Sequence, residues 1–211
     1  MTAAIPEPAP LIGRFIRLDP MSDDDYPGLF DAIAVPEVFA GGYGGGAEGL
    51  PRDLAGFTSF AAGYFGRGSN QTFTIRLVGG EHDGLIVGTS TLGDFDEARE
   101  HAHIGWTAYD PRVWGTAVNA EAKLLLLGLA FDAGFGRVKI QADERNERSR
   151  AAIARLGATF EGLIRRDQKR ADGSWRTTAL FSVIIDDWPA VRSGLEARLD
   201  RADGPVILRR R

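Results

Sequence analysis

The sequence predicts an α/β domain in which a mixed sheet is flanked by helices. Segments rich in β-branched and aromatic residues alternate with segments whose apolar residues recur at helical spacing. Turn residues such as Asp-Pro and Gly-Gly separate these segments, and no internal repeat divides the 211 residues. A chain of this length buries a core of its own. We therefore assign residues 1–200 to one domain and residues 201–211 to a charged C-terminal tail.

The first half of the chain contains two predicted helices and three predicted strands. The first strand ends before Asp19-Pro20, because proline has no N–H to donate to a neighbouring strand. Glycines surround aromatic residues in the segment between the helices, Phe39–Gly46, which we expect to be a loop. In order, the elements are a strand at Gly13–Leu18, a helix from Ser22 or Asp23 to Ala34, a helix at Asp53–Gly66, and strands at Thr72–Val78 and Leu85–Leu92.

A strand, a turn and a helix form the centre of the chain. His103–Tyr109 has the composition of a strand, Asp110-Pro111 ends it, and Val118 begins a helix. The turn Arg112–Ala117 combines N–H groups at a helix start with a glycine and a positive charge, which suits a pyrophosphate group. A simple turn is the alternative. The sequence has no G-x-x-x-x-G-K-S/T, and this turn has no G-x-G-x-x-G, which disfavours a nucleotide kinase and the binding of a dinucleotide at this turn.

The second half predicts three further strands and two helices. We expect the acidic segment Asp94–Glu100 to be a solvated loop, with contact between Asp94 and a cationic substrate as the alternative. The basic run Arg165–Arg170 is also expected to be a solvated loop. In order, the elements are a strand at Arg137–Ala142, a helix at Asn146–Leu156, strands at Thr159–Arg165 and Trp175–Ile185, and a helix that starts at Asp187.

Composition excludes several kinds of chemistry and partner. Hydrophobic residues make up 44% of the chain and charged residues 26%, as in ordinary globular proteins. A net charge of −4 gives no electrostatic support for binding nucleic acid. Without cysteine the chain has no thiol nucleophile, disulfide or cysteine metal site. We see neither a signal peptide nor the ~18 consecutive apolar residues of a membrane span, so we expect a cytoplasmic protein without a membrane partner.

An ordered series of short motifs resembles a known enzyme family. Arg112-x-x-Gly115-x-Ala117 is similar to the Q/R-x-x-G-x-G/A pyrophosphate signature of the GNAT superfamily of N-acetyltransferases. The wider pattern resembles its ribosomal-protein N-terminal acetyltransferase branch, the RimJ/RimL-like proteins. The further matching motifs are Gly88–Leu92, Ile104-Gly105-Trp106, Asn119-x-Glu121-Ala122, Asn146-x-x-Ser149, Glu161-Gly162-x-x-Arg165, and Asp187-Trp188-Pro189 where the family usually has Glu-Trp-Pro.

The resemblance implies the GNAT fold and acetyl-CoA as cofactor. In that fold the strands at Ile104–Tyr109 and Arg137–Ala142 are parallel and splay apart around the pantetheine arm. The loop after the first helix would help to form the substrate pocket, with Phe39 and Tyr43 as its residues. The cofactor-binding residues that the resemblance implies are Trp106, Thr107, Ala108, Arg112, Trp114, Gly115, Thr116, Ala117, Asn119 and Asn146.

Two side chains are candidates for acid–base catalysis. His103 stands where the family usually has a carboxylate, and an imidazole with a pKa of about 6.5 can accept a proton from an amine. The resemblance places Ser149 near the sulfur of CoA, where its hydroxyl would stabilise the leaving thiolate. Asn146 would hold the pantetheine arm or that serine, with helix capping as the alternative for this pair. Tyr109 is a second hydroxyl in range, and backbone N–H groups near Trp106–Ala108 would stabilise the oxyanion.

These features together predict transfer of an acetyl group from acetyl-CoA to a primary amine by direct attack. The expected acceptors are a peptide or protein N-terminus or a small amine, and homodimers are common in the resembling branch. We expect no metal site, because His101 and His103 lack a third ligand in the sequence. The alternative is a non-catalytic acyl-CoA-binding or regulatory module with the same fold. A nucleotide domain that binds phosphate is a weaker third hypothesis.

Overall fold

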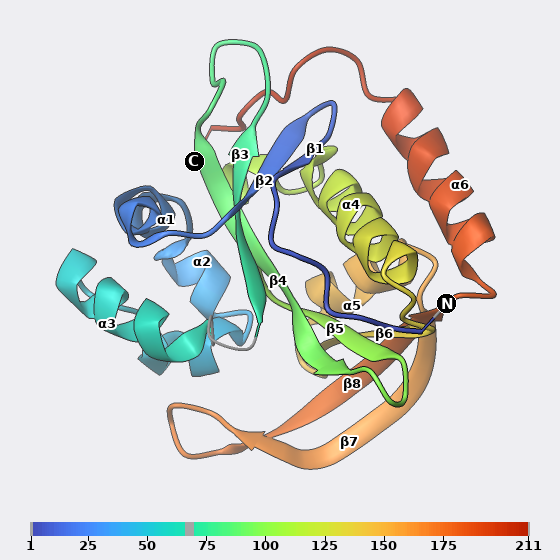
Figure 1. Ribbon diagram of the computed structural model, residues 1–211. Helices are drawn as coiled ribbons and strands as arrows, with labels where there is room; N and C mark the ends of the chain where they lie inside the picture. The colour runs from blue at the N-terminus through green and yellow to red at the C-terminus, as the bar shows by residue number, and fades with distance from the viewer. Residues whose placement is uncertain (1, 66–69, 211) are drawn as a thin grey trace.

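An eight-stranded sheet with helices on both faces forms the protein (Figure 1). The computed structural model describes residues 2–65 and 70–210. The strands lie in the order β1-β2-β3-β4-β5-β6-β8-β7. Their bounds are β1 Leu11–Ile12, β2 Ile16–Pro20, β3 Gln71–Leu77, β4 Ile86–Asp96, β5 His101–Tyr109, β6 Arg137–Asp143, β7 Thr159–Lys169 and β8 Trp175–Ile184. The helices are α1 Tyr26–Ile33, α2 Pro36–Phe39, α3 Leu54–Tyr64, α4 Val118–Asp132, α5 Glu147–Ala154 and α6 Trp188–Asp200.

This mixed sheet confirms the predicted α/β fold class. Its neighbouring strands are antiparallel except for β5 and β6, which run parallel. The parallel pairing covers only three residue pairs, from His101 opposite Arg137 to His103 opposite Lys139. Beyond them β5 continues to Tyr109 without pairing to β6. The two central strands therefore splay apart, as the resemblance implies, and expose backbone groups along the gap.

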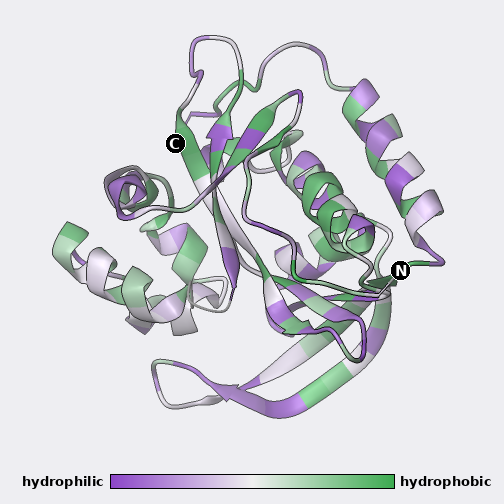
Figure 2. Ribbon diagram, in the orientation of Figure 1, coloured by the Kyte–Doolittle hydropathy of each residue, from purple (hydrophilic) through white to green (hydrophobic). Residues whose placement is uncertain are grey.

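Each face of the sheet carries its own hydrophobic core. On one face α4 and α6 bury residues such as Leu126 and Leu195, and on the other α1 and α3 bury residues such as Leu29 and Phe57. Figure 2 shows that the central strands carry both hydrophobic and hydrophilic residues. Burying apolar side chains on both faces holds the helices against the sheet. No helix in residues 2–65 and 70–210 combines the length and apolar character of a membrane span.

A buried carboxylate fixes the start of α4 against β2. Glu121, in the first turn of α4, accepts N–H groups from Arg14 at 2.7 Å, Phe15 at 2.7 Å and Ile16 at 2.8 Å. A buried carboxylate is costly unless hydrogen bonds stabilise it, and three backbone donors do so here. The helix start and the turn before it are therefore held in a fixed position relative to the sheet.

Two predicted boundaries in the first half of the chain are wrong. The strand predicted at Gly13–Leu18 is instead β2, which starts later and runs to Pro20. Proline is tolerated there because β1 pairs only with Arg17 and Leu18, so β2 is an edge strand at Pro20 and no neighbour needs its N–H. Ser22, predicted with Asp23 as a helix cap, is the N-cap of a 3₁₀ turn at Asp23–Asp25, and α1 itself begins only at Tyr26.

The glycine-rich segment of the first half is only partly a loop. The chain predicted as a loop at Phe39–Gly46 contains the end of α2 and a 3₁₀ turn at Tyr43–Gly45. Four of its glycines have positive φ, which explains the absence of side chains at those positions. The helix predicted at Asp53–Gly66 is α3, and Gly66 lies outside the described residues.

Two segments predicted as charged loops lie partly in strands. The acidic segment Asp94–Glu100 begins inside β4, and its turn covers only residues 97–100. The basic run Arg165–Arg170 lies on β7 as far as Lys169, which pairs with Trp175 of β8. Because β7 is an edge strand that is exposed along nearly its whole length, its sequence lacks the alternation that marks a strand with one buried face.

Candidate active site

A cavity of about 480 Å³ opens where β5 and β6 separate and extends between α4 and α5. Residues from the glycine-rich segment, β5, the turn, α4 and the start of α5, all proposed from the sequence, meet around this one cavity. They are Tyr43, His103, Trp106, Thr107, Ala108, Trp114, Gly115, Thr116, Asn119, Asn146 and Ser149. Three further residues from the same prediction, Phe39, Arg112 and Ala117, do not line it.

The turn before α4 presents free N–H groups. Gly115 adopts a φ of +77°, in the left-handed region that favours glycine. Within the part of the chain that the structure describes, the N–H groups of Ala117 and Asn119 donate no hydrogen bond. The Arg112 guanidinium does not join them, because its Nη2 lies 2.6 Å from Oδ2 of Asp110. The candidate anion site therefore consists of N–H groups and the positive end of the α4 dipole, without that side chain.

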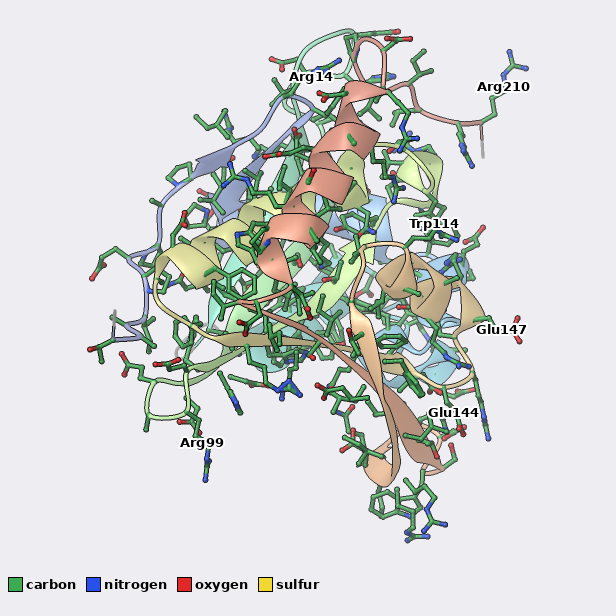
Figure 3. All side chains as sticks on the ribbon, turned by 90° about the vertical axis from the view of Figure 1, so that its right-hand side faces the viewer. Arg14, Arg99, Trp114, Glu144, Glu147 and Arg210 are labelled. Atoms are coloured by element: carbon green, nitrogen blue, oxygen red, sulfur yellow. The ribbon has the colours of Figure 1, made fainter. Side chains whose placement is uncertain are left out.

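Arg209, and not Arg112, places its guanidinium beside the turn. The Arg209 N–H donates to the Arg112 carbonyl at 3.0 Å. A Cβ added at Gly115 would lie 3.1 Å from a guanidinium nitrogen of Arg209. Figure 3 draws Trp114 and the end of the tail, at Arg210, on the same side of the molecule. No feature of the sequence predicts this contact, because it brings together residues almost a hundred positions apart.

A bulge in β5 shapes the cavity wall. The register against β4 shifts between Thr89 and Thr91, and Trp106, on the bulge, has a φ of +49°. Such a conformation costs about 1–3 kcal/mol for a residue with a side chain, and such strain is often found at functional sites. The Tyr43 hydroxyl donates to the Trp106 carbonyl at 3.5 Å. Phe39 packs against Tyr43 with ring centroids 5.5 Å apart, so it supports the wall without lining the cavity.

His103 forms a dyad with Asp94 at the fork between β5 and β6. Its Nδ1 lies 2.9 Å from Oδ2 of Asp94, and Nζ of Lys139 lies 3.0 Å from the same oxygen. The hydrogen bond to His103 is the largest cause that lowers the pKa of Asp94, to about 2. Burial lowers the pKa of His103, and the bond to Asp94 opposes this effect. The ring is therefore neutral at pH 7, with the proton on Nδ1 and a lone pair on Nε2.

The position of the His103 ring depends on the glycine two residues further along β5. A Cβ at Gly105 would lie 2.5 Å from the imidazole ring, so glycine is needed for the ring to lie there. Among the described residues, Nε2 of His103 has no hydrogen-bond partner. A buried imidazole nitrogen without a partner, on the wall of a cavity, is suited to accept a proton from a ligand.

Two other candidate side chains differ from His103. The Tyr109 hydroxyl is buried without a hydrogen-bond partner among the described residues, and burial raises its pKa well above the ordinary value. It stays protonated and cannot act as a base near neutral pH. His101 is exposed at the start of β5. Across residues 2–65 and 70–210, no group of three or more His, Cys, Asp or Glu side chains is placed to hold a metal ion.

Sequence reasoning missed a buried lysine in the cavity wall. Nζ of Lys123 donates to Oγ1 of Thr107 at 3.0 Å and to Oγ of Ser90 at 3.2 Å. Burial lowers the pKa of this amine to about 7. The sequence signal that could have revealed it is a single lysine inside the apolar run of α4. A lysine in such a run is buried unless it lies on the face of the helix that points to solvent.

The start of α5 places the serine and asparagine at the cavity. Oδ1 of Asn146 accepts the Ser149 N–H at 3.0 Å, so the asparagine caps the helix. Its Nδ2 donates to the Gly41 carbonyl, which ties α5 to the glycine-rich segment. Arg148 lies over the Trp114 ring, 3.4 Å from its centroid. The Ser149 hydroxyl forms no hydrogen bond with the described residues.

Comparison with known proteins identifies the fold and the family. The acetyltransferase (GNAT) domain family matches residues 16–159. A GCN5-related N-acetyltransferase from Brucella melitensis is 25% identical, with a TM-score of 0.84 over 99% of this chain and 94% of that one. A protein from T. thermophilus, provisionally named an acetyltransferase, is 31% identical, with a TM-score of 0.78 over 93% and 98%. Mycobacterium smegmatis RimJ in complex with CoA-disulfide shares the fold, at 22% identity and a TM-score of 0.71 over 90% and 93%. No curated protein sequence matches the chain.

Proposed function

Because the chain belongs to the GNAT acetyltransferase family, we propose that it transfers an acetyl group from acetyl-CoA to a primary amine by direct attack. The observation that carries this proposal is one cavity lined both by Gly115 and Asn119, at the start of α4, and by the His103–Asp94 dyad. We propose a peptide or protein N-terminus, or a small amine, as the acceptor, and the cytoplasm as its setting. The fold likeness to RimJ supports a place in the RimJ/RimL-like branch.

The residues of the cavity fit acetyl-CoA at both ends. The N–H group of Asn119, together with that of Ala117 beside the cavity, would hold the diphosphate, and the gap between β5 and β6 would take the pantetheine arm. When bound, acetyl-CoA supplies the activated thioester. Backbone N–H groups near the Trp106 bulge would stabilise the carbonyl oxygen as charge develops on it.

Proton transfer would fall to two side chains. Nε2 of His103 would accept the proton that the amine loses as the C–N bond forms, directly or through water. The Ser149 hydroxyl would donate a hydrogen bond to the sulfur as the C–S bond breaks. An α-amine has a pKa of roughly 7.7–8.0, against about 10.4 for a lysine side chain, so an N-terminus needs less help from the base.

The test is calorimetric titration of the protein with acetyl-CoA, followed by a thiol-release assay with a panel of amines. Gly115→Trp should abolish binding, because its side chain would fill the turn. Gly173→Trp is the matched control, since that glycine has a similar φ of +81° but lies in the β7–β8 turn away from the cavity. A folded wild-type protein that binds no acetyl-CoA would overturn the proposal, whereas binding without release of CoA would favour a non-catalytic module.

A further inference from the structure

The cavity wall contains a buried amine that the proposed mechanism does not use. Lys123 lies in the second turn of α4 and is only 3% exposed, although it lines the cavity. Lysine is rarely buried unless a carboxylate pairs with it. Within residues 2–65 and 70–210 the amine forms no ion pair, and its partners are two hydroxyl groups, Oγ1 of Thr107 at 3.0 Å and Oγ of Ser90 at 3.2 Å.

Both hydroxyl groups belong to the bulge between β4 and β5. The register of these strands shifts between Thr89 and Thr91. Ser90 of β4 therefore stands opposite two residues of β5, Trp106 and Thr107, which is the arrangement of a β-bulge. The amine binds one hydroxyl on each strand, so it connects both sides of the bulge to α4.

Hydrogen bonds continue from the amine across the strained residue of the bulge. Oγ1 of Thr107 donates to the Gly105 carbonyl at 3.3 Å, and these two residues flank Trp106, whose φ is +49°. Oγ of Ser90 lies 2.7 Å from the same Oγ1 and donates to it, because the Thr107 hydroxyl proton is already used. A backbone conformation of this kind persists only where its surroundings hold it. The contacts of Lys123, Ser90 and Thr107 supply part of that support.

The amine suits this place in its neutral form. Burial lowers the pKa of Lys123 to about 7, so the amine is largely neutral above this pH. A neutral amine has two N–H groups, and two hydroxyl oxygens accept them here. The fold does not need these bonds, because the two hydroxyl groups also bond to each other. A buried lysine that lowers stability and binds at the bulge therefore indicates a function rather than a structural need.

We propose that Lys123 is a positioning residue, which holds the β5 bulge in the geometry that aligns its backbone N–H groups with the carbonyl oxygen of the thioester. This inference rests on the proposed function, which places those N–H groups near Trp106. Backbone donors stabilise a developing oxyanion only if they are already in place when the charge forms. Without the amine the bulge should relax, so the transition state loses stabilisation while the ground-state contacts of acetyl-CoA remain.

The experiment compares kcat, acetyl-CoA affinity and stability in Lys123→Met. We expect kcat to fall about 10-fold or more, because complete removal of one oxyanion donor costs about 10²- to 10³-fold. The dissociation constant of acetyl-CoA should stay within about 2-fold of the wild-type value. Stability near pH 7 should rise, because the buried amine is gone. Measurement of kcat at about pH 8.5, above the ordinary imidazole pKa of about 6.5, keeps the protonation of His103 out of the comparison.

A second substitution tests whether the amine acts through the bulge. Thr107→Val removes the acceptor on β5 and should lower kcat to a similar degree. The double variant should lose little more than either single variant, because both changes break the same contact. Lys169→Met is the control for the lysine substitution, because Lys169 is exposed on β7 and does not line the cavity.

Several outcomes would overturn the inference. Wild-type kcat in Lys123→Met would show that the bulge keeps its catalytic geometry without the amine. Equal losses of kcat and acetyl-CoA affinity would indicate a role in cofactor binding, and additive losses in the double variant would show that Lys123 does not act through Thr107. Unchanged kcat in Thr107→Val would contradict the inference even if Lys123→Met did not fold. A wild-type protein that neither binds acetyl-CoA nor releases CoA would instead count against the proposed function.

Discussion

Nδ1 of His103 lies 2.9 Å from Oδ2 of Asp94, at the point where the central strands separate. Asp94 is on β4, His103 on β5 and Lys139 on β6, so the group spans three adjacent strands. His103 and Lys139 form the last pair of the parallel ladder. The register that opens the gap proposed for the pantetheine arm thus also places His103, the proposed base, at its edge.

The hydrogen bond between Asp94 and His103 predicts that substitution of Asp94 changes the pH dependence of kcat. Asp94→Asn should lower the pKa of His103 further, because the carboxylate raises it through a hydrogen bond and through its charge. The acid limb of kcat against pH should then move to lower pH, and the maximal kcat should fall, because the imidazole becomes a weaker base. Asparagine tolerates the φ of +47° at residue 94, so the fold should be retained.

His103→Ala provides the reference for that profile. It should lower kcat by about 10²- to 10⁴-fold, the usual contribution of a general base, while acetyl-CoA affinity stays within about 2-fold. An acid limb that stays in place in Asp94→Asn, together with wild-type kcat in His103→Ala, would show that water or the substrate loses its proton without this ring.

Ser149→Ala should separate transfer from binding. The serine hydroxyl has no partner in the described part of the chain, so its removal should not destabilise the helix that Asn146 caps. We expect kcat to fall about 10-fold or more and the dissociation constant of acetyl-CoA to change little. Asn146→Ala should instead lower the thermal stability of the protein, because it removes the cap of α5 and the bond to Gly41. Equal losses of affinity and kcat in Ser149→Ala would contradict the leaving-group role.

The strand, turn and helix at the centre of the chain could be predicted from the sequence because local signals agree there. Asp110-Pro111 ends the strand, and the apolar spacing after Val118 is helical. The strand predicted at Thr159–Arg165 is the first part of β7, but its continuation to Lys169 could not be predicted, since exposure on both faces removes the alternation that marks a strand. Asp94 was expected on a solvated loop, because its neighbours in sequence are charged while its partners, His103 and Lys139, come from other strands.

The positions of the arginine side chains at the site could not be predicted from the sequence either. Arg112 matches the pyrophosphate signature in sequence, yet Asp110, two residues before it, holds its guanidinium. Arg209 reaches the turn only because the tail folds back over it. Contacts of this kind depend on tertiary packing, which neither periodicity nor spacing records.

Separate substitutions of these two arginines test which side chain contributes to cofactor binding at the turn before α4. Arg209→Gln should raise the KM for acetyl-CoA several-fold with little change in kcat, because its guanidinium lies beside Gly115. Arg112→Gln should affect thermal stability more than KM, since it breaks the contacts with buried Asp110. A larger KM effect from Arg112→Gln would show that this side chain turns to the cofactor on binding, as the sequence signature implies.

Lys123 should destabilise the folded protein at neutral pH. Burial lowers the pKa of its amine to about 7, from 10.5, so between these values the unfolded chain binds more protons than the folded one. Unfolding free energy should therefore rise with pH in this range, by up to about 1.4 kcal/mol per pH unit from this group. Lys123→Met should remove that slope and raise stability near pH 7.

Denaturant unfolding at about pH 7.5 and 9.5 measures the difference in slope between wild type and variant. Thr107 and Ser90 keep a hydrogen bond to each other at 2.7 Å, so the substitution leaves neither hydroxyl without a partner. Lys169→Met is the control, because Lys169 is exposed on β7. Parallel pH dependence in wild type and Lys123→Met would mean that the buried amine keeps its proton in the folded state. The amine would then carry a positive charge in the cavity wall.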